Sequence, residues 1–328
     1  MIVFTRILAA LVLLPTVLFA AGALHFSTLS RSFAEPAAMA LAVLGVAGIV
    51  GVFARRLRPA LYLLLAALAV TFVWFRSIEP SNDRQWQQDV SLQPWAEVND
   101  DVVTFHNVRN FDYRSETDFT PAWYDKSYKL SDLDELDVVA SYWMGKDIAH
   151  LLVSFGFGGR DYLAVSIETR KEVGESYSTL AGFFRRYELF YVVADERDLI
   201  GVRTNYRKDP PEDVYAYRTN APRENIRSLF LDYVRAINDL REHPEFYNTL
   251  TTNCTTTIWR HTLVNSNANP LSWKILASGH VPEYLYELGR INTSMPFDEL
   301  ERRSRVNDAA QAAGKAADFS QRIRAGLP

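Results

Sequence analysis

Cys254 is the single cysteine of this 328-residue chain, and its surroundings favour a reactive thiol. It lies in a polar segment, residues 248–259, which leads into a helical-looking stretch at 258–264 with Asn253 or Thr252 as the natural N-cap. A thiol in the first turn of a helix meets unpaired backbone N–H groups and the positive end of the helix dipole, and both stabilise the thiolate. We therefore predict that Cys254 is a nucleophile. The alternative is a small buried side chain without chemistry.

A cysteine nucleophile needs a base, and histidine is the usual one. The candidates are His25, His106, His150, His243, His261 and His280. His261 follows Cys254 by seven residues. Along a helix that offset is about 10 Å, which is too far for a hydrogen bond. His106 falls in a strand-like run, 102–108, and stays open as an alternative, whereas His150 has the best context.

His150 begins the first arm of a predicted β-hairpin. Residues 150–157 and 161–168 have the composition of strands, and the glycine-rich segment 158–160 joins them. With this three-residue loop, the numbers of paired residues add up to 318, and one face of the hairpin carries an unbroken apolar row. That row, which we expect to face the core, is Leu151, Val153, Phe155, Phe157, Leu163, Val165 and Ile167.

In this register His150 faces Glu168 directly, with Ser166 diagonal to it. Opposite side chains on paired strands have Cβ atoms about 5 Å apart, so a carboxylate can hold the imidazole tautomer and stabilise its charged form. We predict that Cys254, His150 and Glu168 are catalytic and that Ser166 is an oxyanion or substrate-binding group. The alternative is a surface His–Glu pair on a strand.

Three apolar runs without charged residues precede these elements, at about 7–24, 37–54 and 60–75. At about 1.5 Å rise per residue each reaches roughly 24–27 Å, enough to cross a thin hydrocarbon core once flanking residues are included. We predict three transmembrane helices within residues 1–76, followed by a second domain at 77–328. A cleaved signal peptide for the first run and a buried core hairpin for the other two are the alternatives.

The arginines between the apolar runs predict the orientation. Arg55, Arg56 and Arg58 lie in the tight turn between the second and third runs, and the positive-inside bias places them in the cytoplasm. Everything after Arg76 then emerges on the outer face, whether or not the first run is cleaved. In such an oxidising compartment a cysteine without a partner is a free thiol.

The distribution of charge limits the partners. The chain has a formal net charge of −4; its first 76 residues contribute +5, from six arginines and one glutamate, which leaves −9 for the rest. Such an acidic domain has no basic surface for phosphodiester backbones, so we expect no nucleic-acid partner. The spacing of the Cys and His residues does not suggest a metal site, and no phosphate-loop or dinucleotide pattern is present, so we expect no cofactor.

The remaining pattern indicates an α+β domain. Further strands are expected at 188–194, 199–204 and 213–217, and a helix at about 223–240. Beyond the cysteine helix, short helical segments are expected at 282–289 and 298–315.

Several segments together resemble the Lnb-type lipoprotein N-acyltransferase family, a former domain of unknown function. The segments are NVRNF at 107–111, AHLLVSF at 149–155, SIETR at 166–170, YEL at 187–189, RTNYR at 203–207 and YNTLTTNCTT at 247–256. The similarity covers roughly residues 85–328. It implies a permuted papain-like, NlpC-type thiol fold in which His precedes Cys in the chain, and the order His150, Glu168, Cys254 agrees with it.

The resemblance also implies an activity and a location. The enzyme would move an acyl chain from a membrane phospholipid, through a thioester on Cys254, to the N-terminal amine of a diacylated lipoprotein. Aromatic residues such as Trp74 and Phe75, at the end of the last apolar run, favour a site at the lipid headgroups. The protein would be a multi-pass protein of the bacterial inner (cytoplasmic) membrane, with its catalytic domain on the periplasmic face of the bilayer.

Two residues near the thiol are candidates for the oxyanion site. Asn248 lies six residues before Cys254, the offset of the oxyanion glutamine in papain-like enzymes, and Asn253 is adjacent to the thiol. A turn or cap role is the alternative for both. For the whole domain, the alternatives to acyl transfer are a membrane-anchored NlpC-type cysteine peptidase acting on cell-wall peptides and a non-catalytic interaction domain.

Overall fold

The computed structural model describes residues 2–328, which form two compact units. One unit comprises the chain up to Ser81 together with the segment Tyr177–Glu188. The other comprises Asn82–Ser176 and Leu189–Pro328.

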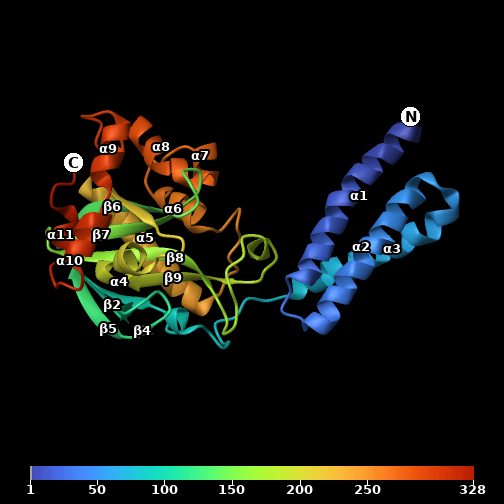
Figure 1. Ribbon diagram of the computed structural model, residues 1–328, viewed down its shortest axis with the longest axis horizontal. Helices are drawn as coiled ribbons and strands as arrows, with labels where there is room; N and C mark the ends of the chain where they lie inside the picture. The colour runs from blue at the N-terminus through green and yellow to red at the C-terminus, as the bar shows by residue number, and fades with distance from the viewer. Residues whose placement is uncertain (1) are drawn as a thin grey trace. The chain divides into compact units, whose positions relative to one another are not determined.

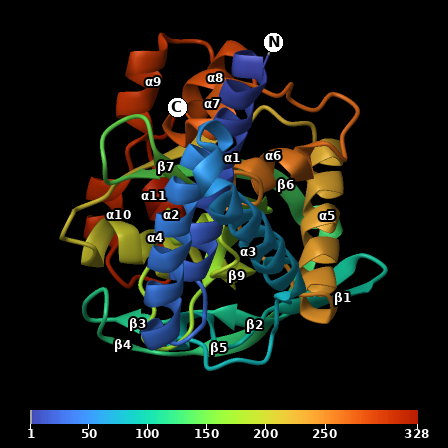
Figure 2. The same ribbon diagram turned by 90° about the vertical axis from the view of Figure 1, so that its right-hand side faces the viewer.

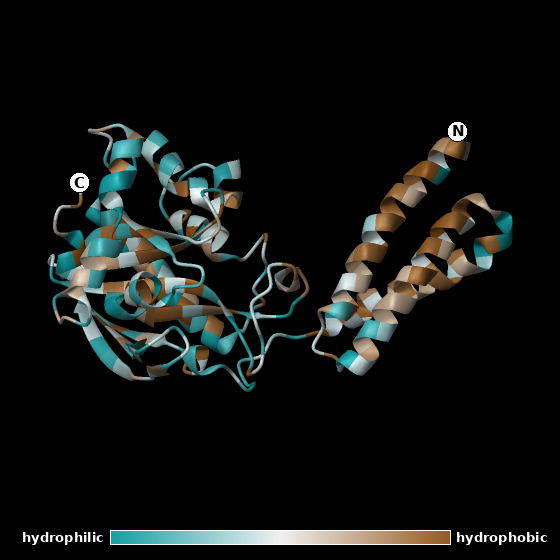
Figure 3. Ribbon diagram, in the orientation of Figure 1, coloured by the Kyte–Doolittle hydropathy of each residue, from teal (hydrophilic) through white to brown (hydrophobic). Residues whose placement is uncertain are grey.

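The first unit is built on three long apolar helices, as predicted: α1 (Ile2–His25), α2 (Arg31–Phe53) and α3 (Arg58–Ser77). Each is long and apolar enough to cross a membrane, and most of each helix is exposed apolar surface (Figure 3). Glycines let the helices approach closely, because a Cβ at Gly45 would collide with Val17 and one at Gly48 with Leu64. Small residues at helix contacts are typical of membrane-spanning bundles.

A loop from much later in the chain, Tyr177–Glu188, belongs to this helical unit. Its Phe184 ring stacks on Phe26, with centroids 5.3 Å apart. Arg185 donates hydrogen bonds to carbonyl oxygens at the C-terminal end of α3, and Arg186 donates to the carbonyl oxygen of Ser27 after α1. The two arginines therefore satisfy carbonyls that the helices leave unpaired at their ends.

The second unit is a mixed α+β domain around an eight-stranded sheet. The strand order is β1-β2-β9-β8-β7-β6-β10, with β5 paired to β2, and β2 runs parallel to β9 (Figure 1). Strands β3 and β4 form a separate two-stranded ribbon. The strands are β1 (Trp95–Asn99), β2 (Val102–Arg109), β3 (Asp112–Tyr113), β4 (Phe119–Thr120), β5 (Trp123–Lys129), β6 (Leu133–Tyr142), β7 (Ala149–Phe157), β8 (Asp161–Arg170), β9 (Glu188–Ala194) and β10 (Asp213–Arg218).

Helices cover both faces of this sheet (Figure 2). They are α4 (Glu196–Gly201), α5 (Arg223–Glu242), α6 (Cys254–Thr262), α7 (Trp273–Leu276), α8 (Val281–Glu287), α9 (Phe297–Ser304), α10 (Asn307–Ala313) and α11 (Phe319–Arg324). One face packs against α5, α6 and α8, for example through Phe155 against Phe230 and Leu151 near Leu285. The other packs against α4, α10 and α11.

The hairpin of β7 and β8 has the predicted register. Val153 pairs with Val165 and Phe157 with Asp161, so the paired numbers add up to 318 and the loop has three residues. The predicted apolar row is buried throughout. The opposite face is buried as well, since Leu152 and Ala164 pack into the α10–α11 cluster. The alternation of apolar residues did not predict burial of this second face, because α10 and α11, which pack on it, come from the last forty residues of the chain.

Two predicted elements are wrong. Residues 199–204 do not form a strand but continue α4 into the π-helical turn Val202–Tyr206. A short apolar run is compatible with either helix or strand, and here Thr204 returns a hydrogen bond to the carbonyl of Ile200, one helical turn earlier.

The expected single helix at 298–315 is divided into α9 and α10. At the break, Arg305 is extended and forms a bridge with Tyr215 of β10, and the Val306 N–H donates to the carbonyl of Val214. Arg305 and Val306 therefore pair with the edge strand β10 and interrupt the helix that the local sequence predicts.

Candidate active site

The N-terminus of α6 holds the thiol. Cys254 is the first residue of the helix, and Asn253 is its N-cap in a capping box: the Asn253 carboxamide oxygen accepts from the Thr256 N–H at 2.9 Å, and the Thr256 hydroxyl accepts from the Asn253 N–H. The Cys254 Sγ lies 3.7 Å from the Thr255 Oγ1 and accepts a hydrogen bond from the backbone of Leu151 in β7. The predicted cap therefore places the sulfur at the positive end of the helix dipole.

His150 lies beside this thiol, near the start of β7. Its Nε2 is 2.7 Å from the Ser166 Oγ and 3.2 Å from the Glu168 Oε1. The Ser166 hydroxyl donates to the same Glu168 oxygen at 2.7 Å, so the serine links the imidazole to the carboxylate. With Nε2 engaged in this way, Nδ1 is the ring nitrogen that can serve the thiol.

The structure therefore brings His150, Ser166, Glu168 and Cys254 together, as the hairpin register and the helix cap predict. The ring of His150 and the side chain of Ser166 are almost fully removed from solvent, and Cys254 is half-buried. A reactive group in such a site is shielded from bulk water but not sealed off.

The electrostatics favour an ion pair between imidazolium and thiolate. Burial alone would lower the pKa of His150, and the repulsion from Arg203 acts in the same direction. The charge of Glu168, together with the charge and hydrogen bond of Cys254, outweighs both, so that the pKa of His150 rises to about 9. Burial alone would raise the pKa of Glu168, yet the charge and hydrogen bond of His150 hold that pKa well below its ordinary value. The imidazole ring is therefore charged at neutral pH.

The same balance acts on the thiol. Burial alone would raise the pKa of Cys254, but the His150 charge and hydrogen bond, together with hydrogen bonds from the Leu151 backbone and the Thr255 hydroxyl, lower it below its ordinary value. A half-buried thiol with a lowered pKa is an activated nucleophile.

Sequence reasoning missed the groups behind Glu168. The guanidinium of Arg203, in the π-helical turn, donates to the Glu168 Oε1 at 3.0 Å and contacts the Glu212 Oε2 at 3.4 Å. Glu212 in turn accepts from Arg207 and from the buried Ser141, the pairing partner of His150 on β6. The RTNYR segment contains both arginines at a spacing of four residues. A helix prediction there would have placed both on one face and pointed to this network.

The two asparagines occupy turn and cap positions. The carboxamide oxygen of Asn248 accepts from the backbone N–H groups of Leu250 and Thr251, at 3.0 and 3.1 Å. The amide nitrogen of Asn253 donates to the carbonyl of Thr249 at 2.7 Å, while its oxygen caps α6. The oxyanion role of either residue remains a prediction.

The other histidines with described contacts have partners elsewhere. His261 is buried between Asp232 and the Tyr191 hydroxyl, each 2.7 Å from a ring nitrogen. His106, the alternative base, is stacked on Trp95 with centroids 3.9 Å apart and contacts Asp125. In residues 2–328 no cluster of three or more His, Cys, Asp or Glu side chains could hold a metal ion.

A family model matches the part of the chain that contains these residues. Residues 119–279 match the model of the Lnb N-terminal periplasmic domain. No curated protein and no solved structure matches the chain. The matched segment spans β4 to the turn before α8 and includes His150, Ser166, Glu168, Arg203 and Cys254. With its three long apolar helices, the chain is a membrane protein with a periplasmic domain. The resemblance noted in its segments is confirmed, since residues 119–279 match an Lnb-type domain.

Proposed function

We propose that this protein is a membrane-anchored, cysteine-dependent acyltransferase that moves an acyl chain from a phospholipid to the N-terminal amine of a lipoprotein. The observation that carries the proposal is the thiol of Cys254 at the start of α6, with its pKa lowered by the charge and hydrogen bond of His150. A role in the processing of membrane lipoproteins is also what the Lnb periplasmic family suggests.

In the first half-reaction, the Cys254 thiolate attacks the ester carbonyl carbon of the phospholipid. The sulfur–carbon bond forms, the ester carbon–oxygen bond breaks, and the lysophospholipid alkoxide leaves with the proton that His150 holds. The products are an acyl thioester on Cys254, a lysophospholipid and a neutral imidazole. The Cys254 backbone N–H at the helix start is a donor for the oxyanion of the intermediate.

In the second half-reaction, the acceptor amine attacks the thioester carbon. Neutral His150 takes the proton that the amine loses, the amide bond forms, and the carbon–sulfur bond breaks to return the thiolate. Glu168, linked through Ser166, keeps the ring oriented and stabilises its charge in both halves. The net change is ester plus amine to amide plus alcohol.

Further parts of the proposal concern fold and location. The sheet with a cysteine helix on one face and the histidine on a neighbouring strand supports a permuted papain-like arrangement. The arginine-rich turn Arg55–Leu57 between α2 and α3 supports a cytoplasmic turn, and hence a multi-pass protein of the inner membrane. Phospholipid, the bilayer and a diacylated lipoprotein are the partners that this scheme requires.

The proposal is tested by detecting the acyl thioester on Cys254. Detergent-purified protein is incubated with phospholipid labelled in its acyl chain and without acceptor, and labelled protein is then treated with neutral hydroxylamine. We expect a hydroxylamine-labile adduct that is absent from Cys254→Ala and present in a His243→Ala control, since His243 is an exposed histidine after α5. A protein that forms no adduct but cleaves cell-wall peptides would be a peptidase instead.

A further inference from the structure

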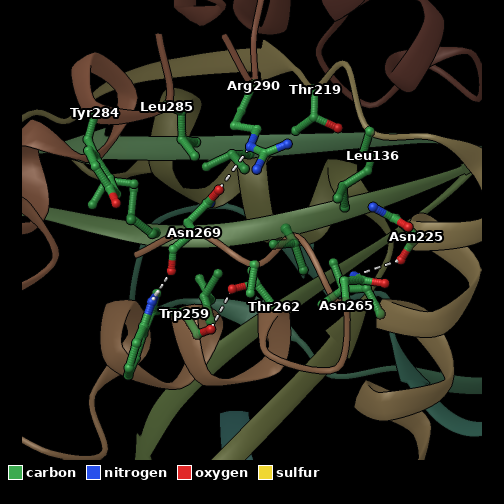
Figure 4. A pocket seen from close by; sticks show the side chains of 18 of the residues that line it. Leu136, Thr219, Asn225, Trp259, Thr262, Asn265, Asn269, Tyr284, Leu285 and Arg290 are labelled. Atoms are coloured by element: carbon green, nitrogen blue, oxygen red, sulfur yellow. Dashed lines mark hydrogen bonds between the residues drawn. The ribbon is translucent and has the colours of Figure 1, made fainter. Parts of the chain in front are cut away.

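A cavity of about 130 Å³ lies under the cysteine helix, on the sheet face covered by α5, α6 and α8 (Figure 4). One wall is a stripe of α6: Thr255, Ile258, Trp259 and Thr262. These positions are three, four and seven residues from the first, which places them on one side of the helix. The facing wall is formed by apolar side chains of the sheet, among them Leu151.

Two residues that contact the sulfur of Cys254 also line the cavity. Thr255 lines it, follows Cys254 directly and has its Oγ1 3.7 Å from the Sγ. Leu151 also lines it, follows His150 directly and supplies the backbone hydrogen bond to the thiol. From Thr255 to Thr262 the stripe extends about 10 Å along the helix axis. A group attached to the sulfur could therefore enter the cavity and run along α6.

The polar side chains around the cavity are largely engaged with one another. The Trp259 Nε1 donates to the carbonyl of Asn269 at 2.9 Å, and the Arg290 guanidinium donates to the Asn269 side chain and the Asn267 carbonyl (Figure 4). The side chain of Asn225 donates to that of Asn267 at 2.9 Å. These hydrogen bonds fix the loop beside the cavity and pair the guanidinium of Arg290 with loop oxygens. The interior of the cavity therefore offers a ligand mainly apolar contacts.

One hydroxyl is an exception. Thr219 is one of the residues that line the cavity, and its Oγ1 is buried without a hydrogen-bond partner among the described residues. A polar ligand would gain by pairing with it, whereas an apolar ligand would gain nothing from it. This residue therefore distinguishes between the two kinds of occupant.

We propose that this cavity holds the acyl chain while its carbonyl carbon is bound to Cys254, so that it is the acyl-chain site of the enzyme. This inference rests on the proposed acyl transfer. An unbranched hydrocarbon chain needs no hydrogen bond, and apolar cavities of comparable size bind apolar ligands. A peptide in the same place would bring backbone N–H and carbonyl groups, for which the paired polar rim has little to offer.

The test uses the full-length protein in detergent and p-nitrophenyl esters from acetyl to dodecanoyl. The burst of p-nitrophenol measures acylation of Cys254. In the wild type, we expect the rate constant to rise up to about fourfold per added methylene until the cavity is filled. Thr262→Phe on α6 and Ala221→Phe in the turn before α5 fill the cavity from two different segments and should stop this rise at shorter chains. Ala312→Phe, on the exposed side of α10, is the matched control and should behave as the wild type does.

The Thr219→Val variant tests independently whether the occupant of the cavity is polar or apolar. Valine has nearly the same shape and removes the unpaired hydroxyl, so an acyl chain should react at the same rate or faster. Slower reaction of the long esters in this variant alone would indicate a polar occupant and overturn the proposal.

The outcomes separate this inference from the proposed function. If Thr262→Phe and Ala221→Phe both keep the wild-type dependence on chain length, the acyl-chain site is wrong while acyl transfer stands. If no ester, acetyl included, acylates Cys254, the proposed function fails and this inference fails with it.

Discussion

Cys254 and His150 act at the residue scale as one unit, because each changes the pKa of the other. We expect Cys254→Ser to abolish turnover and thioester formation, since an alkoxide is much harder to generate than a thiolate in the same site. His150→Ala should be as severe, and the double variant little worse than either. The measurement is turnover with labelled phospholipid, with membrane insertion as the control. Turnover retained by Cys254→Ser would remove the thiol from the mechanism.

The pH dependence of alkylation reports the same pair. The thiolate–imidazolium pair exists above the lowered pKa of Cys254 and persists until His150 loses its proton at about pH 9. Iodoacetamide should therefore react with Cys254 at lower pH than with an ordinary thiol. His150→Ala removes the charge that favours the thiolate, so its reactivity should move to higher pH. An unchanged profile in His150→Ala would show that the helix start alone activates the sulfur.

Arg203 should set the upper limit of this pH window. Its positive charge lowers the pKa of His150, whereas the charge of Glu168 raises it. Arg203→Gln should therefore move the alkaline limb of turnover up, and Glu168→Gln should move it down. Arg203→Gln also leaves Glu212 with one buried ion-pair partner fewer, and breaking a buried pair costs about 3–5 kcal/mol, so its melting temperature should fall. A lower melting temperature with an unmoved limb would make Arg203 merely structural.

At the scale of elements, Asn248 in the turn before α6 has two possible roles: it can stabilise the turn or bind the oxyanion. The oxygen of its carboxamide holds the turn, and its nitrogen is the donor that an oxyanion would need. Asn248→Asp keeps the accepting oxygen and removes the donor. We expect it to keep the melting temperature and to lose about 100-fold in turnover, the usual cost of one lost oxyanion donor. Asn248→Ala should lose both.

The alkylation rate of Cys254 in Asn248→Asp is the control for the thiol itself. If the aspartate variant is as active as the wild type, and only the alanine variant melts early, Asn248 is a turn residue. Asn253→Ala offers a comparison, because loss of an N-cap costs about 1 kcal/mol and acts through helix stability.

Local elements were predictable, and distant packing was not. The β7–β8 register followed from the alternation of apolar residues around a glycine-rich loop, and the cap of α6 followed from Asn253. Both depend on neighbours within about ten residues. The Arg203–Glu212 network was missed because the run at 199–204 is equally compatible with a strand, whereas in the structure it is helical and packs in the core beside the sheet.

At the scale of the whole molecule, the residues that we propose as catalytic and the three long apolar helices belong to different compact units. The buried clusters of the sheet domain contain residues from Val90 onward, so that domain has a core of its own. The loop Tyr177–Glu188 is different. Its Phe184 packs on Phe19 and Phe26 of the helical unit, and no sequence pattern linked residues so far apart. Removal of the helices would expose this loop.

A fragment that begins at Ser77 tests whether the bilayer takes part in the mechanism. We expect it to fold and to keep an alkylatable Cys254, because the thiol and its partners lie within the sheet domain. It should no longer acylate membrane-embedded acceptors, with partial recovery on short-chain lipid monomers in solution, since the anchor would no longer bring it to the lipid. Phe184→Ser in the same fragment is the matched control for aggregation through the exposed ring. If the fragment instead cleaves muropeptides and never forms a thioester with lipid, the acyltransferase proposal fails and an anchored peptidase takes its place.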